Sequence, residues 1–447
     1  MPRTILHCDL NNFFASVEVI LNPDLVGHPV AVCGDPEKRT GIVLAKCERA
    51  KKCGIKTGDA VWMAIQKCPD IQIVQPRHNK YGEFSRKVRD IYYRFTDKVE
   101  SFGIDECWLD VTNSFNLFCK ESKCEGKTDI EMGEELAYKI KSLIKEELGL
   151  TISAGVSWNK TYAKLGSDLK KPDAVSVINR ENYKQIVWTL PVQDMLFVGR
   201  KTARMFEKLS IKTIGDLANF DEKLLEARLG ITAKRLVKAA RGDCDDEVSS
   251  AHYNRQVKSV GNGTTTPKDM TTLKEITQVV YVLAEEVATR MRRKNLRGYT
   301  VNLSIRDEEL KWQGAQTSIK TPTDNARTIV DPAMEIFCKL TKIKNCKYSQ
   351  AKTSTQTQND TPLPFPVHSI RVSVSNLTHN KHAQLDLFND GTGEDEESHL
   401  TKTFDKLRNK YGADKLAYGT ALGGQMDIDF EVLDEGNEEP TIIMDGS

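Results

Sequence analysis

Residues 4–21 read TILHCDLNNFFASVEVIL, and the fold of the first part of the chain follows from them. The apolar run that ends at Asp9 predicts a short strand, and the apolar spacing from Phe13 to Leu21 predicts a helix. Asn22 and Pro23 end that helix. An acid therefore lies at the carboxyl end of a strand, at a tight turn into a helix.

A second stretch reads KVESFGIDECWLDVT from residue 98 to residue 112. Its two extended runs are separated only by Asp105 and Glu106, so we expect a hairpin with both acids at its tip. Because the layer is compact, Asp9 and these two acids are expected to lie close together. A polar hairpin turn without any ligand is the alternative explanation of the two adjacent acids.

Clustered carboxylates of this kind predict a metal site. Three carboxylates repel one another unless a hard cation lies between them. Mg²⁺ prefers carboxylate oxygens together with substrate phosphates. Two such ions about 3.5–4 Å apart would activate an attacking hydroxyl and stabilise the leaving oxygen of a phosphoryl transfer.

Strands and helices alternate through the first 170 residues. This alternation predicts a split βαβ, ferredoxin-like layer. The strands are expected at 29–33, 41–45 and 150–156, and the helices around 47–53, 81–96 and 129–148.

Residues 171–250 turn mainly helical and contain two short helix pairs, at 198–217 and 229–242. Both pairs resemble helix-hairpin-helix elements. The glycine turns of such elements present backbone N–H groups to DNA phosphates without reading bases. The turns here would form around Gly199 and Gly230.

A further module of strands and helices is expected from residue 251 to about 376, with a Ser/Thr/Gln/Pro-rich surface loop at 348–366. Charge divides unevenly: residues 389–447 hold 15 Asp/Glu against 5 Lys/Arg, and the remainder holds 48 against 59. A basic body with an acidic tail is typical of a protein that binds a polyanion. Within the tail, a helix is expected at 400–410.

The overall composition is that of a globular protein. The chain has 447 residues, of which 39% are hydrophobic and 28% charged, which excludes a wholly disordered or fibrous chain. The 11 cysteines form no C-x-x-C pair, so we expect reduced thiols and neither a disulfide framework nor a zinc site. No apolar run approaches the roughly 20 residues that span a bilayer, and no signal-like segment begins the chain, so we expect a soluble, cytoplasmic protein without membrane contact.

Several further residues are candidates for nucleotide binding. Asn11 and Asn12 are suitable N-cap residues, and a helix N-terminus offers free N–H groups to a triphosphate. Lys51 and Lys164 are candidates for phosphate contacts, with ordinary surface lysines as the alternative. The aromatic residues Phe13 and Phe14 could equally pack in the core.

The stretches HCDLNNFFASVE, from His7 to Glu18, and SFGIDECWLD, from Ser101 to Asp110, together resemble the paired motifs of Y-family translesion DNA polymerases. The resemblance extends over residues 3–388. It implies an α+β, right-hand polymerase with a ferredoxin-like palm, small fingers, a helical thumb with helix-hairpin-helix elements and an α/β little finger. The implied bounds are 1–12 and 76–170 for the palm, 13–75 for the fingers, 171–250 for the thumb, 251–378 for the little finger, and 379–447 for a clamp-binding segment with an acidic tail.

The resemblance also implies residue roles. Asp9, Asp105 and Glu106 match the catalytic, metal-binding acids, and the Leu10 carbonyl would complete a site for two Mg²⁺ ions. Phe14 matches the steric gate, whose ring would clash with a ribose 2′-hydroxyl. The nucleotide-binding residues implied with it are Phe13, Lys51 and Lys164.

Four positions depart from the pattern of the family. Asn11 replaces the second acid of the frequent D-x-D, and Glu48 stands where many members have a phosphate-contacting tyrosine. Lys51 replaces an arginine, and Gly103 replaces the serine of S-x-D-E. Asn11 and Glu48 resemble the UmuC-like branch. Phe14 and the domain plan resemble DNA polymerase IV.

The sequence QLDLF at residues 384–388 looks like the bacterial sliding-clamp pentapeptide. Leucine and phenylalanine anchors in a short segment are suited to docking in an apolar groove. The implied clamp-binding residues are Gln384, Leu385, Leu387 and Phe388. A stray amphipathic turn is the alternative.

The function implied is that of a template-directed, error-prone translesion DNA polymerase. It would add deoxynucleotides to the primer 3′-hydroxyl of primer-template DNA, as a monomer, in the DNA damage response. A catalytically silent DNA- and clamp-binding protein at stalled primer ends is one alternative. A nucleotide cyclase with a similar two-metal palm is another, although it would not need helix-hairpin-helix elements.

Overall fold

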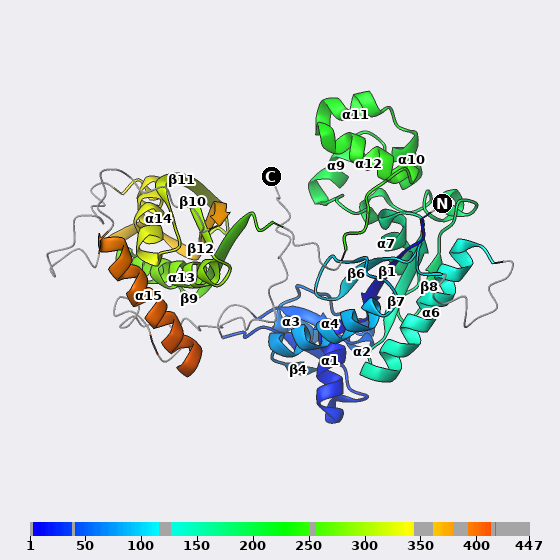
Figure 1. Cartoon of the computed structure of the whole chain (residues 1–447), viewed down its shortest axis with the longest axis horizontal. Coiled ribbons are helices and arrows are strands. Elements are labelled where there is room, and N and C mark those ends of the chain that lie inside the picture. The colour runs from blue at the N-terminus through cyan, green and yellow to red at the C-terminus, as the bar shows by residue number, and fades with distance from the viewer. Residues whose placement is uncertain are drawn as a thin grey trace. The chain divides into compact units, whose positions relative to one another are not determined.

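The structure is a computed structural model of the chain, and it describes residues 3–37, 41–115, 127–250, 256–343, 361–379, 392–412 and 416. The described residues form two compact units: residues 3–34 and 42–250 belong to the first, and residues 256–343, 361–379 and 392–412 belong to the second (Figure 1). No helix in the described ranges has both the length and the apolar composition needed to cross a membrane.

A five-stranded sheet organises the first unit. Strand β1 (Ile5–Leu10) lies at its centre and runs antiparallel to both β6 (Glu106–Asp110) and β7 (Ile152–Ser157). The edges are β5 (Val99–Ser101), antiparallel to β6, and β8 (Val175–Val177), parallel to β7. This mixed sheet with its helices is consistent with the predicted α+β class.

The alternation of side chains along β1 assigns its residues to two faces of the sheet. Leu6, Cys8 and Leu10 belong to the main core cluster of this unit, which includes residues of helices α4 (His78–Tyr93) and α6 (Asp129–Leu148). His7 and Asp9 instead contact residues of, or next to, helix α7 (Lys160–Leu169). The polar face of β1 is therefore the face that α7 covers.

A smaller sheet lies within residues 28–75. Its strands are β2 (Val30–Cys33), antiparallel to β3 (Val43–Lys46) and parallel to β4 (Gln72–Val74). The predicted strands and the predicted helices α1 (Phe13–Leu21) and α2 (Glu48–Lys52) are confirmed within a few residues. Helix α3 (Val61–Lys67) and β4 were not predicted, because neither is long enough for its apolar spacing to stand out.

The predicted helical region carries α8 (Tyr183–Ile186), α9 (Arg200–Lys208), α10 (Ile214–Asn219), α11 (Glu222–Leu229) and α12 (Ile231–Arg241). The second helix pair starts earlier than expected, since α11 precedes Gly230. That glycine has φ 59° and ψ −145°, which a residue with a side chain rarely adopts, so the chain turns there between α11 and α12.

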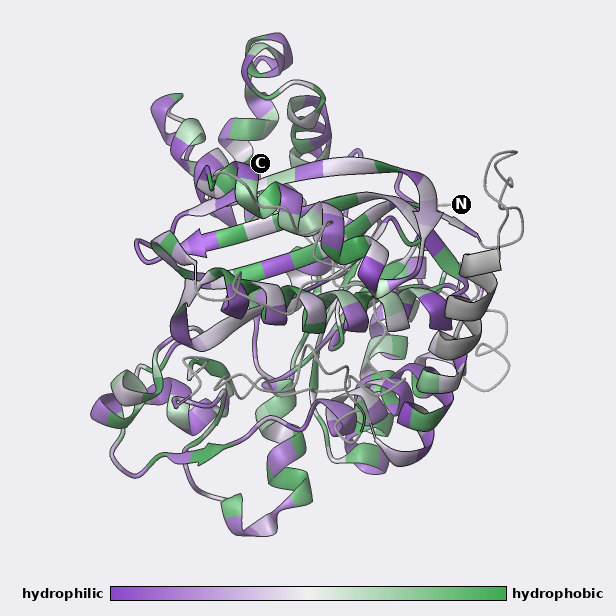
Figure 2. Ribbon diagram, turned by 90° about the vertical axis from the view of Figure 1, so that its left-hand side faces the viewer, coloured by the Kyte–Doolittle hydropathy of each residue, from purple (hydrophilic) through white to green (hydrophobic). Residues whose placement is uncertain are grey.

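The second unit is a four-stranded antiparallel sheet with helices α13 (Leu273–Arg293) and α14 (Ala326–Thr341) packed on it. Figure 2 shows hydrophobic and hydrophilic residues mixed along the strands of this sheet. The strand order is β11 (Trp312–Thr323), β10 (Leu296–Asp307), β12 (Pro362–His379) and β9 (Ser259–Thr272).

The surface loop predicted at 348–366 is wrong at its end, where Pro362 already lies in β12 and pairs with Thr272. Its prolines suggested a loop, but the alternating Leu363, Phe365 and Val367 pack on the core of the second unit. The rest of this loop, 348–360, lies outside the described residues. The helix expected at 400–410 lies within the longer α15 (Thr392–Tyr411).

Candidate active site

Strand pairing brings the predicted acids together. Asp9 lies opposite Glu106 in the register of β1 and β6, and the Leu10 amide donates a hydrogen bond to the Asp105 carbonyl at 3.0 Å. Both acids were expected at the hairpin tip, but Glu106 is the first residue of β6 and only Asp105 belongs to the turn. Glu106 is thus paired with Asp9 across the two strands, and a backbone hydrogen bond connects the end of β1 to the turn that contains Asp105.

Two lysines contact these acids. The Lys164 ammonium, from α7, lies 3.3 Å from Asp9 Oδ2 and 3.0 Å from Glu106 Oε2. The Lys171 ammonium lies 2.6 Å from the same oxygen of Asp9. Both lysines also contact Asp168, at 3.3 and 2.8 Å. Two positive charges therefore lie against Asp9, Glu106 and Asp168.

His7 is a buried residue that contacts Glu106. Its ring is fully buried, with Nδ1 at 2.8 Å from Ser167 Oγ and Nε2 at 3.2 Å from Glu106 Oε2. Ser167 Oγ donates to the Lys164 carbonyl at 2.8 Å, so the hydroxyl accepts from His7 Nδ1–H. Burial lowers the pKa of His7. His7 Nε2 and Glu106 Oε2 are thus in contact, without a hydrogen bond between them.

The electrostatics of the three acids differ. Burial, followed by the charges of Glu106 and Asp9, raises the pKa of Asp105 to about 6. Burial also raises the pKa of Asp9, although Lys171 opposes this shift. For Glu106, burial is outweighed by His7 and Lys164, which together lower its pKa to about 2.

The donor chemistry of the site fits a hard divalent cation. Within the described ranges, no three His, Cys, Asp or Glu residues are grouped closely enough to hold a metal ion, and Lys164 bridges Asp9 and Glu106. Burial, followed by the charges of Glu106 and Asp9, disfavours the ionised form of Asp105 in this structure, and carboxylates are the ligands that Mg²⁺ takes. Leu10 is buried beside Asp9 at the end of β1.

The two adjacent phenylalanines have different surroundings. The Phe14 ring is partly buried and stacks on Tyr81, with centroids 4.1 Å apart and an interplanar angle of 12°. The Tyr81 hydroxyl donates to Glu18 Oε1 at 2.7 Å, and this hydrogen bond fixes the ring on which Phe14 stacks. Phe13 is buried in the core, which favours a packing role. Its contact with a nucleotide stays a prediction.

The expected side-chain cap of α1 is wrong. Asn12 adopts a left-handed conformation, φ 51°, and its side chain donates instead to Glu48 Oε1 at 3.2 Å. Asn11 is buried, and its amide interacts with Thr151 and Ser153 of the neighbouring chain segment. The positive φ of Asn12 turns its side chain away from the first helical turn, so backbone N–H groups there are left to other partners.

Lys51 is not among the lysines that contact the three acids. Its side chain is 53% exposed, and its ammonium lies 3.5 Å from Glu48 Oε1. The departures at Glu48 and Lys51 thus form one contact group with Asn12, at the start of α1 and α2. Of the two lysines predicted from the sequence, Lys164 contacts the acids and Lys51 does not.

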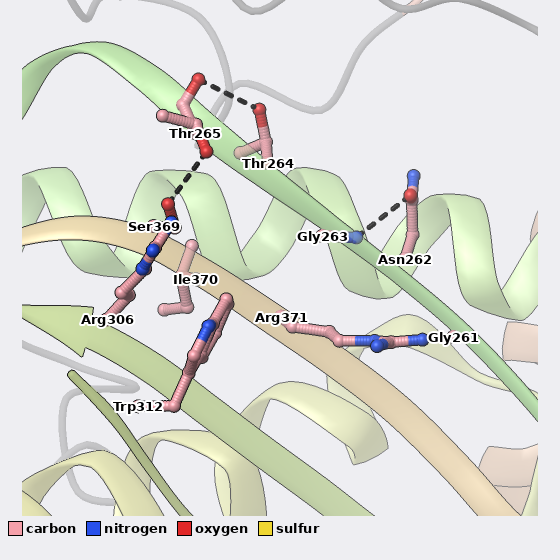
Figure 3. Close-up of a pocket in the computed structure, with 10 residues that line it drawn as sticks. All are labelled: Gly261, Asn262, Gly263, Thr264, Thr265, Arg306, Trp312, Ser369, Ile370 and Arg371. Atoms are coloured by element: carbon pink, nitrogen blue, oxygen red, sulfur yellow. Dashed lines mark hydrogen bonds between the residues drawn. The ribbon is translucent and has the colours of Figure 1, made fainter. Parts of the chain in front are cut away.

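The sheet of the second unit carries a basic hollow. Arg306 follows the buried Ile305, and Arg371 lies between the buried Ile370 and Val372, so both arginines point away from the helix-covered face. Trp312 is 55% exposed, and the Arg306 guanidinium lies 5.8 Å from its ring centroid. Figure 3 shows both arginines and Trp312 beside residues 261–265 of β9. Cationic groups with an aromatic face are suited to nucleic-acid strands.

Three residues at the acids were missed by sequence reasoning: His7, Asp168 and Lys171. A signal was present for the first two. His7 is two residues before Asp9 and therefore on the same face of the strand. Asp168 is four residues after Lys164, on the same side of α7. The segment Gln384–Phe388 lies outside the described residues.

Comparisons with known proteins show what this chain is similar to. A family model described as the impB/mucB/samB family matches residues 8–168, and that of its C-terminal domain matches residues 257–387. A DNA polymerase IV of Acetivibrio thermocellus is 40% identical over 94% of this chain and 98% of its own length. A DNA polymerase IV of Moorella thermoacetica is 34% identical over 94% and 96%. A solved Y-family DNA polymerase chimera, Dbh-Dpo4(243-245)-Dbh, is 26% identical, with a TM-score of 0.68 over 84% of this chain and 100% of its own.

Proposed function

Because this chain belongs to the impB/mucB/samB family, as a Y-family translesion DNA polymerase of the DNA polymerase IV type, we propose that Asp9, Asp105 and Glu106 are its catalytic acids. The resemblance seen in the sequence is confirmed, and the catalytically silent alternative is not favoured. The observation that supports the three acids is their juxtaposition by strand register, with Asp9 opposite Glu106 and Asp105 in the adjoining turn.

Divalent metal ions are general in this family, and we propose two Mg²⁺ ions held by the three acids and the Leu10 carbonyl. When bound, they would activate the primer 3′-hydroxyl and stabilise the charge of the leaving pyrophosphate. The protein's own contribution is to fix the carboxylates. The β1–β6 pairing holds Asp9 and Glu106 on one face.

The incoming deoxynucleotide is the next part of the proposal. Lys164 supplies a cation to the triphosphate, because its ammonium already lies at the acids. The Phe14 ring, fixed by its stack on Tyr81, would exclude a ribose 2′-hydroxyl. Phe13 and Lys51 remain predicted contributors to nucleotide binding.

Primer-template DNA is the polymer substrate of a DNA polymerase. We propose that the glycine turns near Gly199 and Gly230 and the hollow with Arg306, Trp312 and Arg371 contact its backbone. We also propose a palm, fingers, a thumb and a little finger with the bounds predicted from the sequence. We propose that the protein acts as a monomer in the cytoplasm.

The sliding clamp is a proposed partner through Gln384, Leu385, Leu387 and Phe388. Replacing Leu387 and Phe388 together by alanine should weaken binding to a bacterial sliding clamp at least about tenfold in calorimetric titration, because such apolar anchors dominate peptide docking. Unchanged affinity would refute the assignment. Primer extension without the clamp provides the check that the variant is otherwise intact.

Primer extension on undamaged DNA with Mg²⁺ tests the catalytic acids. The chain with Asp9, Asp105 and Glu106 all changed to alanine should extend at least about 100-fold more slowly than the unaltered chain. Asp97→Asn serves as the control, because this acid is exposed and precedes the same hairpin. Equal extension by the triple variant would disprove the assignment of these acids.

A further inference from the structure

Two cysteines contact each other at the ends of helices α2 and α3, away from the three acids. Cys53 directly follows α2, and Cys68 directly follows α3. The Cys53 thiol is a hydrogen-bond partner of the Cys68 thiol, and both thiols are free. Two sulfur atoms in contact need little movement to form a bond, so this pair is suited to a disulfide.

Packing between the two helices fixes this contact. Ala50 of α2 and Ala64 of α3 are fully buried in one hydrophobic cluster, to which Cys68 also belongs. Cys53 lies three residues after Ala50, and Cys68 lies four residues after Ala64, so each cysteine is about one turn beyond the packed alanine of its helix. The Cys68 amide donates to the Ala64 carbonyl at 3.0 Å. The positions of both cysteines are therefore set by the packing of the helices.

The two thiols differ in their access to solvent. Cys53 is exposed, whereas Cys68 is only 6% exposed. Burial, followed by the contact with Cys53, raises the pKa of the Cys68 thiol, so this thiol stays protonated at neutral pH. Oxidants react with thiolates that they can reach. Cys53 is therefore the thiol that an oxidant in solution meets first.

Cys8 and Cys107 provide a contrast within the same unit. They lie opposite each other in the register of β1 and β6, so they too are neighbours. Both are buried, with 0% and 4% exposure, and an oxidant in solution reaches neither thiol. An exposed thiol beside a buried one thus distinguishes the pair of Cys53 and Cys68 from this second pair.

We propose that Cys53 and Cys68 form a reversible disulfide when hydrogen peroxide oxidises the chain. In the first step, the Cys53 thiolate attacks one peroxide oxygen, the O–O bond breaks, and Cys53 becomes a sulfenic acid as one water molecule is released. In the second step, the Cys68 sulfur attacks the Cys53 sulfur, the S–S bond forms, and the sulfenic oxygen leaves as a second water molecule. The two thiols lose two electrons and two protons in total, and these reduce the peroxide to water.

The disulfide keeps oxidation at the end of α2 reversible. A sulfenic acid without a neighbouring thiol is oxidised further to sulfinic and sulfonic acids, which thiol reductants do not restore. A disulfide is instead returned to two thiols by thiol–disulfide exchange. Cys68 thus acts as the resolving thiol that protects Cys53. This inference does not depend on the proposed function, and its test needs neither DNA nor nucleotide.

Peptide mapping of the full chain after treatment with hydrogen peroxide tests the proposal. The remaining thiols are blocked with N-ethylmaleimide, the chain is digested without reductant, and the peptides are identified by mass spectrometry. Most of Cys53 should be found in a peptide linked to Cys68, and dithiothreitol should separate the two peptides. Cys8 and Cys107 should stay unlinked, because both are buried.

Substitutions separate the roles of the two thiols. Cys68→Ser removes the resolving thiol, so labelling of the Cys53 sulfenic acid by dimedone should rise at least about fivefold. Cys53→Ser removes the exposed thiol, and the buried Cys68 should then remain a thiol. Cys244→Ser is the matched control, because it removes a half-buried thiol that follows α12 and should leave the link between Cys53 and Cys68 unchanged.

The proposal is overturned if Cys53 stays unlinked after peroxide treatment, or if it is linked mainly to another cysteine. Equal dimedone labelling of Cys53 in the unaltered chain and in Cys68→Ser would also overturn it, since Cys68 would then not resolve the sulfenic acid. Cys68→Ala provides the same comparison if a serine at this buried position impairs folding. The mapping of the unaltered chain requires no substitution.

Discussion

Asp105 shows how a single residue of the proposed active site opposes folding. Its pKa in the folded chain, about 6, lies above the ordinary value of 3.8, chiefly because of burial and then because of Glu106 and Asp9. The ionised form is therefore disfavoured in the folded state. This destabilisation is complete above pH 6 and disappears as the pH falls through 6 towards 3.8.

We predict that Asp105→Asn is inactive but more stable. At pH 7.5 and without metal ions, its free energy of unfolding should exceed that of the unaltered chain by about 1–3 kcal/mol. The gain should shrink as the pH falls to 5, because the native aspartate then takes up a proton itself. Urea unfolding at several pH values measures both effects.

Two controls accompany this measurement. Asp97→Asn, at an exposed position, should leave stability unchanged within about 0.5 kcal/mol. Added Mg²⁺ should stabilise the unaltered chain more than Asp105→Asn. If Asp105→Asn were no more stable than the unaltered chain at pH 7.5, the ionised Asp105 side chain would not destabilise the folded state.

Phe14 tests sugar selection at the same scale. Phe14→Ala removes the ring stacked on Tyr81 and should lower discrimination against ribonucleotides at least about tenfold, because the clash with the 2′-hydroxyl is lost. Single-nucleotide incorporation with matched deoxy- and ribonucleotides measures this. Tyr81→Phe keeps the stack but loses the hydroxyl that bonds Glu18, so it should retain discrimination. Equal selectivity in Phe14→Ala would exclude the gate role.

At the scale of elements, the contact between α7 and β7 positions Lys164. A Cβ atom on Gly155 would lie 2.0 Å from the Ala163 carbonyl oxygen and 2.4 Å from the Ser167 amide nitrogen. Both are helix backbone atoms that cannot move alone. The absence of a side chain at Gly155 thus lets α7 lie directly on the strand.

We predict that Gly155→Ala destabilises the chain by about 3 kcal/mol, because the helix must be displaced, and that primer extension falls with it. Thermal and urea unfolding measure the first effect. Gly103→Ala is the control, since its Cβ would meet only the Asp105 side chain, at 3.4 Å. Its stability should change by less than about 0.5 kcal/mol. If Gly155→Ala were as stable as the unaltered chain, α7 would not pack directly on β7 at Gly155.

At the scale of the whole molecule, the second unit has a core of its own, contributed by its sheet and by α13 and α14. The last helix, α15, is joined to this unit by Asp405, whose carboxylate pairs with Arg292 at 2.6 Å. Arg292 is only 12% exposed and also contacts the buried Glu285. Removing Asp405 would leave a buried network with altered charge.

We therefore predict that a fragment of residues 256–447 unfolds cooperatively by itself. A fragment ending at 391 should be less stable by about 1–3 kcal/mol, because Arg292 loses its ion pair with Asp405. Urea denaturation of both fragments, with Asp405→Asn in the longer one, measures the difference. An unfolded long fragment would refute the independent core, and equal stability of all three would refute the role of α15.

Much of the site was predictable, since its main residues lie in short, strongly patterned stretches. The apolar run before Asp9 and the spacing from Phe13 to Leu21 predicted β1 and α1 correctly. Prediction failed where local preference and packing disagree. Asn12 is a preferred cap residue that does not cap, and Pro362 favours a loop but begins a strand. In both cases contacts with distant residues prevail over local preference.

The sequence by itself determined the motifs and the family and predicted the three acids, because these depend on residue types at short spacing. Only the tertiary structure placed Glu106 opposite Asp9 and brought Lys171 and Asp168 to the acids. Register between strands far apart in the chain is set by which faces are buried, and a shift of one residue would turn Asp9 to the opposite face. No local spacing encodes such a contact, so the lysine network became visible only once the sheet and α7 were packed together.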